Sequence, residues 1–218
     1  MSRLRAIWLG RMAFEPALRL QLEARDALVA GTGPATLFLV EHPPTLTIGR
    51  RGRREDVLWT DEQLATQGMV VCDTPRGGEV TLHAPGQLVC YPIVAVGRRI
   101  REHLVDLAEV TRELLAELGL TDTEFRMEHP GVWSGERKLA SIGVHISRGV
   151  SVQGLSLNLD VDRTLFAALV SCGMRSVEVV SATTLGARPI ALADAATRWA
   201  ELYATRIGVQ LEWAPFAP

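Results

Sequence analysis

The chain contains 218 residues with a mass of 23.8 kDa, the size of one domain with a substantial core. Hydrophobic residues make up 47% and charged residues 22%, which excludes disordered and collagen-like chains. The net charge of −2 argues against a dedicated nucleic-acid-binding domain, and no apolar run reaches the roughly 20 residues of a membrane span. Three separated cysteines and the lack of a signal-peptide pattern predict a reduced, cytoplasmic protein.

Hydrophobic periodicity predicts a mixture of strands and helices without regular βαβ alternation. In chain order we expect a strand at 4–9, a helix at 14–30, strands at 35–40 and 45–48, a basic loop at 50–54, a short helix at 61–67, a strand at 69–72, a glycine-bearing loop at 76–87, a strand at 88–94, a helix at 101–118, adjacent strands at 139–146 and 152–159, a short helix at 163–170, a helix at 189–206 and a strand at 209–213. This mixture predicts an α/β (α+β) fold, with residues 1–218 forming a single domain around a central mixed sheet.

The basic residues are almost all of one type. The sequence has 22 arginines and a single lysine, Lys138. Arginine keeps its proton in proteins, whereas lysine can lose it, so the lone lysine marks a position where arginine would fail. Survival of one lysine by chance is an equally good explanation before its context is known.

Two stretches have the residue types of a reactive site. Residues 76–87, RGGEVTLHAPGQ, combine glycines with polar side chains and could let a backbone approach a ligand, although this stretch taken alone favours a plain hairpin. Cys172 precedes a glycine and is a candidate nucleophile, provided that a histidine or Lys138 helps to form its thiolate. Cys72 and Cys90 lie within apolar strands and are expected to be buried hydrophobic residues.

The remaining charged residues give weaker indications. The five histidines have no metal-binding spacing, so we expect no metal site. We also expect no cofactor. His103 falls on a charged helix face and is expected to be solvated, and His145 is expected at a rim. The arginines of residues 50–54 are either an ordinary solvated loop, the commoner case, or a docking surface for an acidic protein.

Six motifs occur together in an order typical of one family. They are EHPPTLTIGRRG (41–52), RGGEVTLHAPGQLVCYPI (76–93), GVW (131–133), KLASIGVHISRGV (138–150), GLSLNL (154–159) and SCG (171–173). With these motifs the chain resembles the lipoate-biosynthesis octanoyltransferases, which move an octanoyl group from acyl carrier protein to a protein lysine. The resemblance implies the fold of the lipoate–protein and biotin–protein ligases.

The resemblance also implies which residues form the site. It places a catalytic cysteine–lysine pair on Cys172 and Lys138. It places an acyl-binding site on three stretches, namely Arg76, Gly77, Gly78, Glu79, Val80, Thr81, Leu82 and His83, then Ser141, Ile142 and Gly143, and finally Gly154, Leu155 and Ser156. The family usually has glycine, histidine and proline where this chain has Ala84, Gln153 and Ser171. If position 84 needs a positive φ, alanine strains the loop.

The implied reaction is acyl transfer in two steps through a Cys172 thioester, with Lys138 as general acid and base. The implied partners are octanoyl-acyl carrier protein and the apo lipoyl domains of 2-oxoacid dehydrogenase complexes and the glycine cleavage H protein, with no nucleic acid and no membrane. Two alternatives stay open: an ATP-dependent lipoate–protein ligase of the same fold, and a non-catalytic module that binds acyl-carrier or lipoyl domains.

Overall fold

The structure is a computed structural model, and it describes residues 2–170 and 177–216. In these residues the main sheet has nine strands, in the order β12-β1-β2-β6-β10-β9-β8-β7, with β11 beside β9. The strands are β1 (Arg3–Arg11), β2 (Ala35–Glu41), β6 (Gln87–Ile93), β7 (Glu124–Arg126), β8 (Gly131–Ser134), β9 (Arg137–Ser147), β10 (Val150–Asn158), β11 (Glu178–Val179) and β12 (Gln210–Trp213). β1 is parallel to β2 and β12, and β11 is parallel to β9, whereas the other pairs are antiparallel. The predicted mixed sheet is confirmed.

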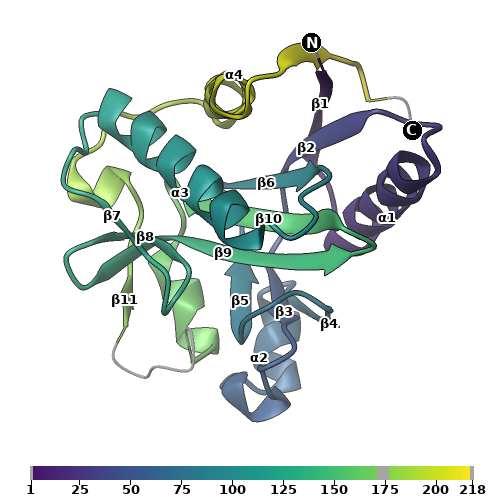
Figure 1. Cartoon of the computed structure of the whole chain (residues 1–218). Helices are drawn as coiled ribbons and strands as arrows, with labels where there is room; N and C mark the ends of the chain where they lie inside the picture. Colours follow the sequence, from purple (N-terminus) through teal and green to yellow (C-terminus); the bar gives the residue numbers. More distant parts are fainter. Residues whose placement is uncertain (1, 171–176, 217–218) are drawn as a thin grey trace.

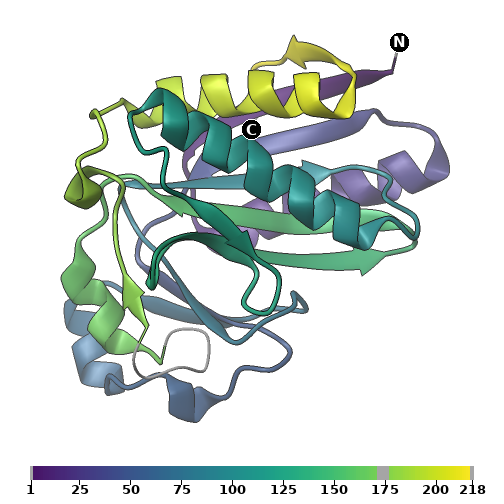
Figure 2. The same cartoon turned by 60° about the vertical axis from the view of Figure 1, so that its left-hand side comes forward.

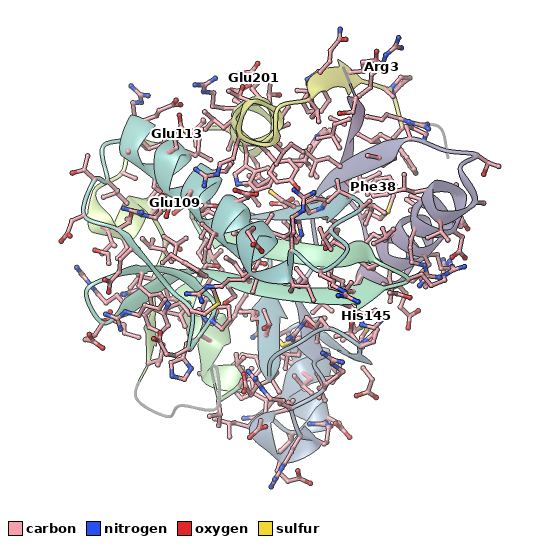
Figure 3. The ribbon with its side chains drawn as sticks, in the orientation of Figure 1. Arg3, Phe38, Glu109, Glu113, His145 and Glu201 are labelled. Atoms are coloured by element: carbon pink, nitrogen blue, oxygen red, sulfur yellow. The ribbon has the colours of Figure 1, made fainter. Side chains whose placement is uncertain are left out.

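Helices cover both faces of this sheet because its strands alternate large apolar residues on both sides. Leu37 and Leu39 of β2 belong to the core beneath α3 (Ile100–Glu117) and α4 (Leu192–Ile207), which lie side by side in Figures 1 and 2. Phe38 turns to the other face, toward α1 (Phe14–Ala30), and this arrangement is visible in Figure 3.

The outer faces of α3 and α4 are polar. Glu113 of α3 and Glu201 of α4 are exposed and project away from the sheet (Figure 3). None of the helices in residues 2–170 and 177–216 is both long and apolar enough to cross a membrane.

A second, smaller sheet lies below the main one in Figure 1. Its strands are β4 (Val70–Asp73), β3 (Thr45–Ile48) and β5 (Val80–His83), in that order, and α2 (Asp61–Thr66) packs beside them. Three short 3₁₀ helices are described: η1 (Arg54–Asp56), η2 (Arg163–Ala168) and η4 (Thr183–Leu185). The small sheet has its own apolar core, which includes Leu46, Leu82 and Ala84.

Most predicted elements are present, with several differences. β9 and β10 pair along their length, as expected for residues 139–146 and 152–159. The helix predicted at 163–170 is the 3₁₀ helix η2, and strands β5, β7, β8 and β11 were not predicted. These four strands have two to four residues, but length alone does not explain the difference, because β3, β4 and β12 also have four residues and were predicted.

Candidate active site

A cavity of about 170 Å³ lies where the small sheet meets the β9–β10 hairpin of the main sheet. It brings three separate stretches of the chain together with the lone lysine. The predicted residues that line it are Arg76, Gly77, Gly78, Glu79, Val80, Thr81, His83, Lys138, Ser141, Ile142, Gly143, Gly154, Leu155 and Ser156. Leu82 does not line it, because its side chain is buried in the core of the small sheet.

The cavity also has an apolar part that sequence reasoning did not identify. Val89 and Tyr91 of β6, Leu104 of α3, Pro130, and Val144 of β9 line it together with the predicted residues. Each of these residues is unremarkable in the sequence, and only the pairing of β6 and β10 and the packing of α3 bring them here.

Lys138 is almost entirely buried at the start of β9, with 3% of its surface exposed. Its Nζ lies 5.1 Å from the centroid of the Trp133 ring, within the range of a cation–π contact. A Cβ at Gly131 of the same strand as Trp133 would lie only 2.7 Å from Lys138 Cε. The lysine side chain therefore packs against an indole ring and against a glycine that has to lack a side chain.

Cys172, the predicted nucleophile, lies outside the described residues. The described chain on either side is held by backbone hydrogen bonds, and on the C-terminal side the partner is Lys138 of the cavity wall. Before the gap, the Val170 N–H donates to the Asp56 carbonyl at 2.8 Å. After the gap, β11 pairs with the Arg137–Lys138 end of β9, and the Val180 N–H donates to the Lys138 carbonyl at 3.0 Å.

Neither of the two described cysteines has a thiolate-favouring environment. Burial raises the pKa of the Cys90 thiol well above its ordinary value, and this residue packs in the main core. The pKa of Cys72 is also raised, by burial and by the carboxylates of Glu15 and Asp73. Burial of Cys90 is confirmed, whereas Cys72 is only half-buried.

Arg76 places a buried cation in the cavity wall, with 6% of its surface exposed. Its guanidinium donates to the Thr47 carbonyl at 2.6 Å, to the Thr47 hydroxyl at 2.9 Å and to the Gly77 carbonyl at 3.0 Å. These bonds fix the planar group, so the cavity has a preorganised positive charge suited to a carbonyl or an anionic oxygen.

Glycines allow the walls of the cavity to come together. Gly143 and Gly154 are cross-strand partners on β9 and β10. A Cβ at Gly143 would lie 3.1 Å from the Gly77 carbonyl oxygen, and one at Gly154 would lie 2.2 Å from the Cys90 carbonyl oxygen. Any side chain at either position would push the 76–78 stretch or β6 away from the hairpin.

Two of the departures from the family pattern can be located. Ala84 has no positive φ and is buried in the small-sheet core, so the strain considered for this position is absent. Gln153 does have a positive φ, of 64°, and lines the cavity. Its backbone N–H donates to Gln21 Oε1 at 2.8 Å, and its side chain donates to the Thr74 hydroxyl. These bonds hold Gln153 in its left-handed conformation.

Two buried histidines lie together beside the cavity. His83 Nδ1 lies 2.8 Å from Gln87 Oε1, and the ring centroids of His83 and His42 are 5.4 Å apart. Burial lowers the pKa of His83 to about 3, with smaller contributions from the neighbouring His42 and from the Arg76 guanidinium. Burial lowers the pKa of His42 to about 4. Both rings are therefore neutral near pH 7.

His42 was not singled out by sequence reasoning. It lies 2.6 Å from the Met12 carbonyl through Nδ1 and 2.9 Å from the Tyr91 hydroxyl through Nε2. Because the carbonyl can only accept, Nδ1 carries the proton and Nε2 accepts from Tyr91. Its role is to hold Tyr91 in the cavity wall.

The expectations for the other histidines differ in outcome. His103 was expected to be solvated, and this is wrong: it has 5% of its surface exposed and lies 2.9 Å from the Ser151 hydroxyl. His145 is partly exposed near the end of β9, as expected for a rim residue (Figure 3). In the described residues no group of three or more His, Cys, Asp or Glu side chains could hold a metal ion.

The basic loop at 50–54 borders the cavity through Arg51. Two of its arginines have acidic partners at the surface: Arg51 Nε lies 3.0 Å from Glu79 Oε1, and Arg54 lies 2.7 Å from Asp61 Oδ1. Docking of an acidic protein on this loop stays a prediction.

Comparison with known proteins supplies the identity. The lipoyl protein ligase A/B catalytic domain matches residues 14–203. The octanoyltransferase of Geobacter metallireducens is 39% identical over 189 residues, which cover 85% of each chain. That of Caldicellulosiruptor saccharolyticus is 32% identical over 215 residues, or 97% of this chain and 92% of the relative. This chain belongs to the octanoyltransferase family. The family and enzyme class predicted from the motifs, an octanoyltransferase of lipoate biosynthesis, are confirmed.

Solved structures confirm the predicted fold. A putative lipoate protein ligase from T. acidophilum with bound lipoic acid has a TM-score of 0.77 at 13% identity, covering all of this chain and 90% of that one. A biotin protein ligase from Leishmania major has a TM-score of 0.56 at 12% identity, covering 95% and 76%. At these identities the likeness concerns the fold alone.

Proposed function

We propose that the chain transfers an octanoyl group from octanoyl-acyl carrier protein to the lysine ε-amine of apo lipoyl domains, through a thioester on Cys172. Residues 1–218 would act as one catalytic domain, in the cytoplasm. The observation that carries the proposal is a buried lysine, Lys138, in the wall of a cavity whose other walls are apolar side chains and a fixed guanidinium.

In the first step the Cys172 thiol gives its proton to Lys138, and the sulfur attacks the thioester carbonyl. The bond between the carbonyl carbon and the carrier sulfur breaks, and the carrier thiolate takes the proton from Lys138. In the second step the substrate amine attacks the acyl-enzyme and loses a proton to Lys138, which returns it to the departing Cys172 sulfur. Thioester exchange is nearly balanced and amide formation from a thioester is downhill, so the reaction needs no ATP, metal or cofactor.

The cavity supplies binding energy for the chain of the acyl group. Val89, Leu104, Ile142 and Leu155 offer apolar surface, and each buried CH₂ contributes about 0.8 kcal/mol. This favours octanoyl over much shorter chains. Arg76 and backbone N–H groups of the glycine-rich stretch are candidates to bind the carbonyl oxygen as it becomes charged.

The lipoyl-domain acceptor is supported by the fold. One solved structure of this fold is that of a bi-partite lipoate protein ligase and its E2 lipoyl domain from Thermoplasma acidophilum, with a TM-score of 0.79 and 14% identity. Lipoyl domains of 2-oxoacid dehydrogenase complexes and the glycine cleavage H protein are the proposed acceptors here.

The test is intact-mass analysis after mixing the purified chain with octanoyl-acyl carrier protein without ATP. We expect a covalent octanoyl adduct that peptide mapping places on Cys172. The adduct should be lost in Cys172→Ala and retained in Cys72→Ala and Cys90→Ala, the matched controls. An adduct that persists in Cys172→Ala would refute the assignment of the nucleophile.

The same experiment separates the two alternatives. An ATP-dependent ligase would give no product until ATP and a free acid are added, and a non-catalytic module would form no adduct under either condition. A structure of the same fold is titled as lipoate-protein ligase A bound with ATP, with a TM-score of 0.77 and 14% identity. The ATP-free arm is therefore essential.

A further inference from the structure

The cavity wall contains a histidine whose protonation pattern is set by its neighbours. His83 lies at the end of β5 and lines the cavity. Its ring is parallel to that of Phe14, with a centroid distance of 5.9 Å, and edge-on to that of His42. With 5% of its surface exposed, the ring has little freedom to turn.

Gln87 determines which nitrogen of His83 carries the proton. Gln87 Nε2 donates to the Leu82 carbonyl at 3.0 Å and to Asn158 Oδ1 at 2.8 Å. A backbone carbonyl can only accept, so the amide nitrogen has to face it and Oε1 has to face His83. Oε1 can also only accept, so His83 Nδ1, 2.8 Å away, has to carry the proton.

Asn158 fixes the other end of this series of hydrogen bonds. Its Nδ2 donates to the Val180 carbonyl at 3.3 Å, which leaves Oδ1 to accept from Gln87. Two backbone carbonyls, those of Leu82 and Val180, therefore orient both amides. Neither amide is free to turn without leaving a buried polar group unpaired, which costs more than the bond itself contributes.

The ring nitrogen that remains, Nε2, therefore has a lone pair and no proton. Among residues 2–170 and 177–216, Nε2 has no hydrogen-bond partner, and His83 lines the cavity, so this nitrogen is the one available to a group bound there. The nearby guanidinium of Arg76 and the second buried histidine, His42, both oppose protonation of this ring. The cavity thus contains a fixed hydrogen-bond acceptor.

The chemistry of the two substrates shows which one an acceptor can bind. The reacting acyl thioester offers a carbonyl oxygen, which is itself an acceptor. The attacking amine offers N–H groups, and its nitrogen becomes positive as it bonds to the carbonyl carbon. An acceptor that faces these N–H groups is worth more in the transition state than in the ground state.

We infer that His83 Nε2 accepts an N–H from the incoming lysine amine and orients its lone pair toward the acyl-enzyme, and that Gln87 and Asn158 are positioning residues that hold His83 in the Nδ1–H tautomer. This inference rests on the proposed function, because it needs an acyl-enzyme and an attacking amine. It reassigns His83 from the acyl-binding stretch to the second half-reaction. Lys138 still takes the proton that leaves the nitrogen.

The first test separates the half-reactions in His83→Phe, which keeps the ring and its stacking but removes the acceptor. The octanoyl-enzyme is formed with octanoyl-acyl carrier protein, isolated, and mixed with an apo lipoyl domain, and both rates are followed by mass. We expect acyl-enzyme formation within a few-fold of wild type and deacylation slowed about 10- to 100-fold, the range for one hydrogen bond to a charged group. His103→Phe is the matched control, since His103 is also buried with one hydrogen bond but lies outside the cavity. It should change neither rate.

Other results of this experiment overturn the inference. Unchanged deacylation in His83→Phe means that the ring binds no amine. If only the rate of acyl-enzyme formation falls, His83 instead binds the donor, for example through an amide N–H of a pantetheine arm. Absence of any adduct in the wild type refutes the proposed function itself, which is a distinguishable failure.

The second test reads the tautomer directly and does not need activity. Nitrogen-15 NMR of the histidine rings at pH 7.5 should show His83 protonated on Nδ1 alone. Gln87→Glu should convert His83 to the doubly protonated ring, because a carboxylate favours the charged form, and should slow deacylation as His83→Phe does. A proton on Nε2 in the wild type, or a doubly protonated ring in Gln87→Glu with wild-type deacylation, overturns the inference. If Gln87→Glu does not fold, the wild-type spectrum decides alone.

Discussion

Replacing Gly131 with alanine tests whether the position of Lys138 is essential for activity. The added Cβ would lie 2.2 Å from the Ala140 carbonyl oxygen and 2.7 Å from Lys138 Cε. The first neighbour is backbone of the paired strand β9 and cannot swing aside. Restoring ordinary contact distances requires a shift of about 1 Å between β8 and β9 at the lysine, and a misplacement of that size costs on the order of 10²-fold in rate.

The stability cost should be moderate. Overpacking a well-packed site typically costs about 1–3 kcal/mol, a minor part of the roughly 5–15 kcal/mol of a typical domain. Gly131→Ala should therefore stay folded at 25 °C with a lower Tm. Single-turnover acyl transfer, measured by mass, should be about 10²-fold slower than in the wild type.

The matched control is Gly135→Ala in the turn of the same β8–β9 hairpin. Gly135 has a φ of 54°, and no atom lies within 4 Å of the position that an added Cβ would take, so alanine there is strained but collides with nothing. Left-handed backbone costs a residue with a side chain about 1–2 kcal/mol, similar to the loss expected for Gly131→Ala. The two variants should lose comparable stability while only Gly131→Ala loses activity. If the turnover rates of Gly131→Ala and Gly135→Ala lie within three-fold of each other, the close packing of Gly131 against Lys138 is not what positions the lysine for activity.

Three further predictions concern the lysine, the histidines and the basic loop. Lys138→Arg should lose at least about 10²-fold in single-turnover transfer between pH 6 and 9, because arginine keeps its proton and cannot act as a base; a rate within a few-fold of wild type would make Lys138 an electrostatic group only. Burial lowers the pKa of His42 and His103 to about 4 and that of His83 to about 3, so below pH 6.5 the unfolded chain binds protons that the folded chain does not. The free energy of unfolding should therefore be highest above pH 6.5 and should decrease down to about pH 4, by about 1.4 kcal/mol per pH unit for each of these histidines. Urea midpoints that stay constant between pH 6.5 and pH 4 would contradict this prediction. Neutralising the four arginines of the 50–54 loop to glutamine should lower kcat/KM for octanoyl-acyl carrier protein at low salt and flatten its salt dependence; a variant equal to wild type would leave the loop a solvated surface.

Residues with a local signal in the sequence could be predicted, and residues that only the fold brings together could not. Lys138 was identified by composition and by motif, and it lies in the cavity wall. Leu82 was included because a contiguous motif was taken whole, although alternation along a strand already assigns it to the face opposite Thr81 and His83. His42 and Tyr91 could not be predicted as a pair, since 49 positions separate them and only the packing of the fold brings them to 2.9 Å.

His103 shows a signal that was present and misinterpreted. It shares a helix face with Leu107, Val110 and Leu114, at spacings of four, seven and eleven residues, which is the apolar stripe of α3. The charged neighbours in sequence belong to the other face. The helical period, applied to every position, would have placed His103 in the core.

Backbone hydrogen bonds join the start of the basic loop to the glycine-rich stretch that forms one wall of the cavity. The Gly49 N–H donates to the Glu79 carbonyl at 3.0 Å, Arg50 to the Arg76 carbonyl at 3.0 Å and Arg51 to the Gly78 carbonyl at 3.1 Å. On its other side the wall is joined to the main sheet, where the Gly77 N–H donates to the Val144 carbonyl at 3.0 Å. A shift of the loop is therefore transmitted to Arg76 and its neighbours, because these bonds leave the backbone little independent freedom. If the proposed carrier docks on this loop, these hydrogen bonds are the route by which its contact would reach the wall of the cavity.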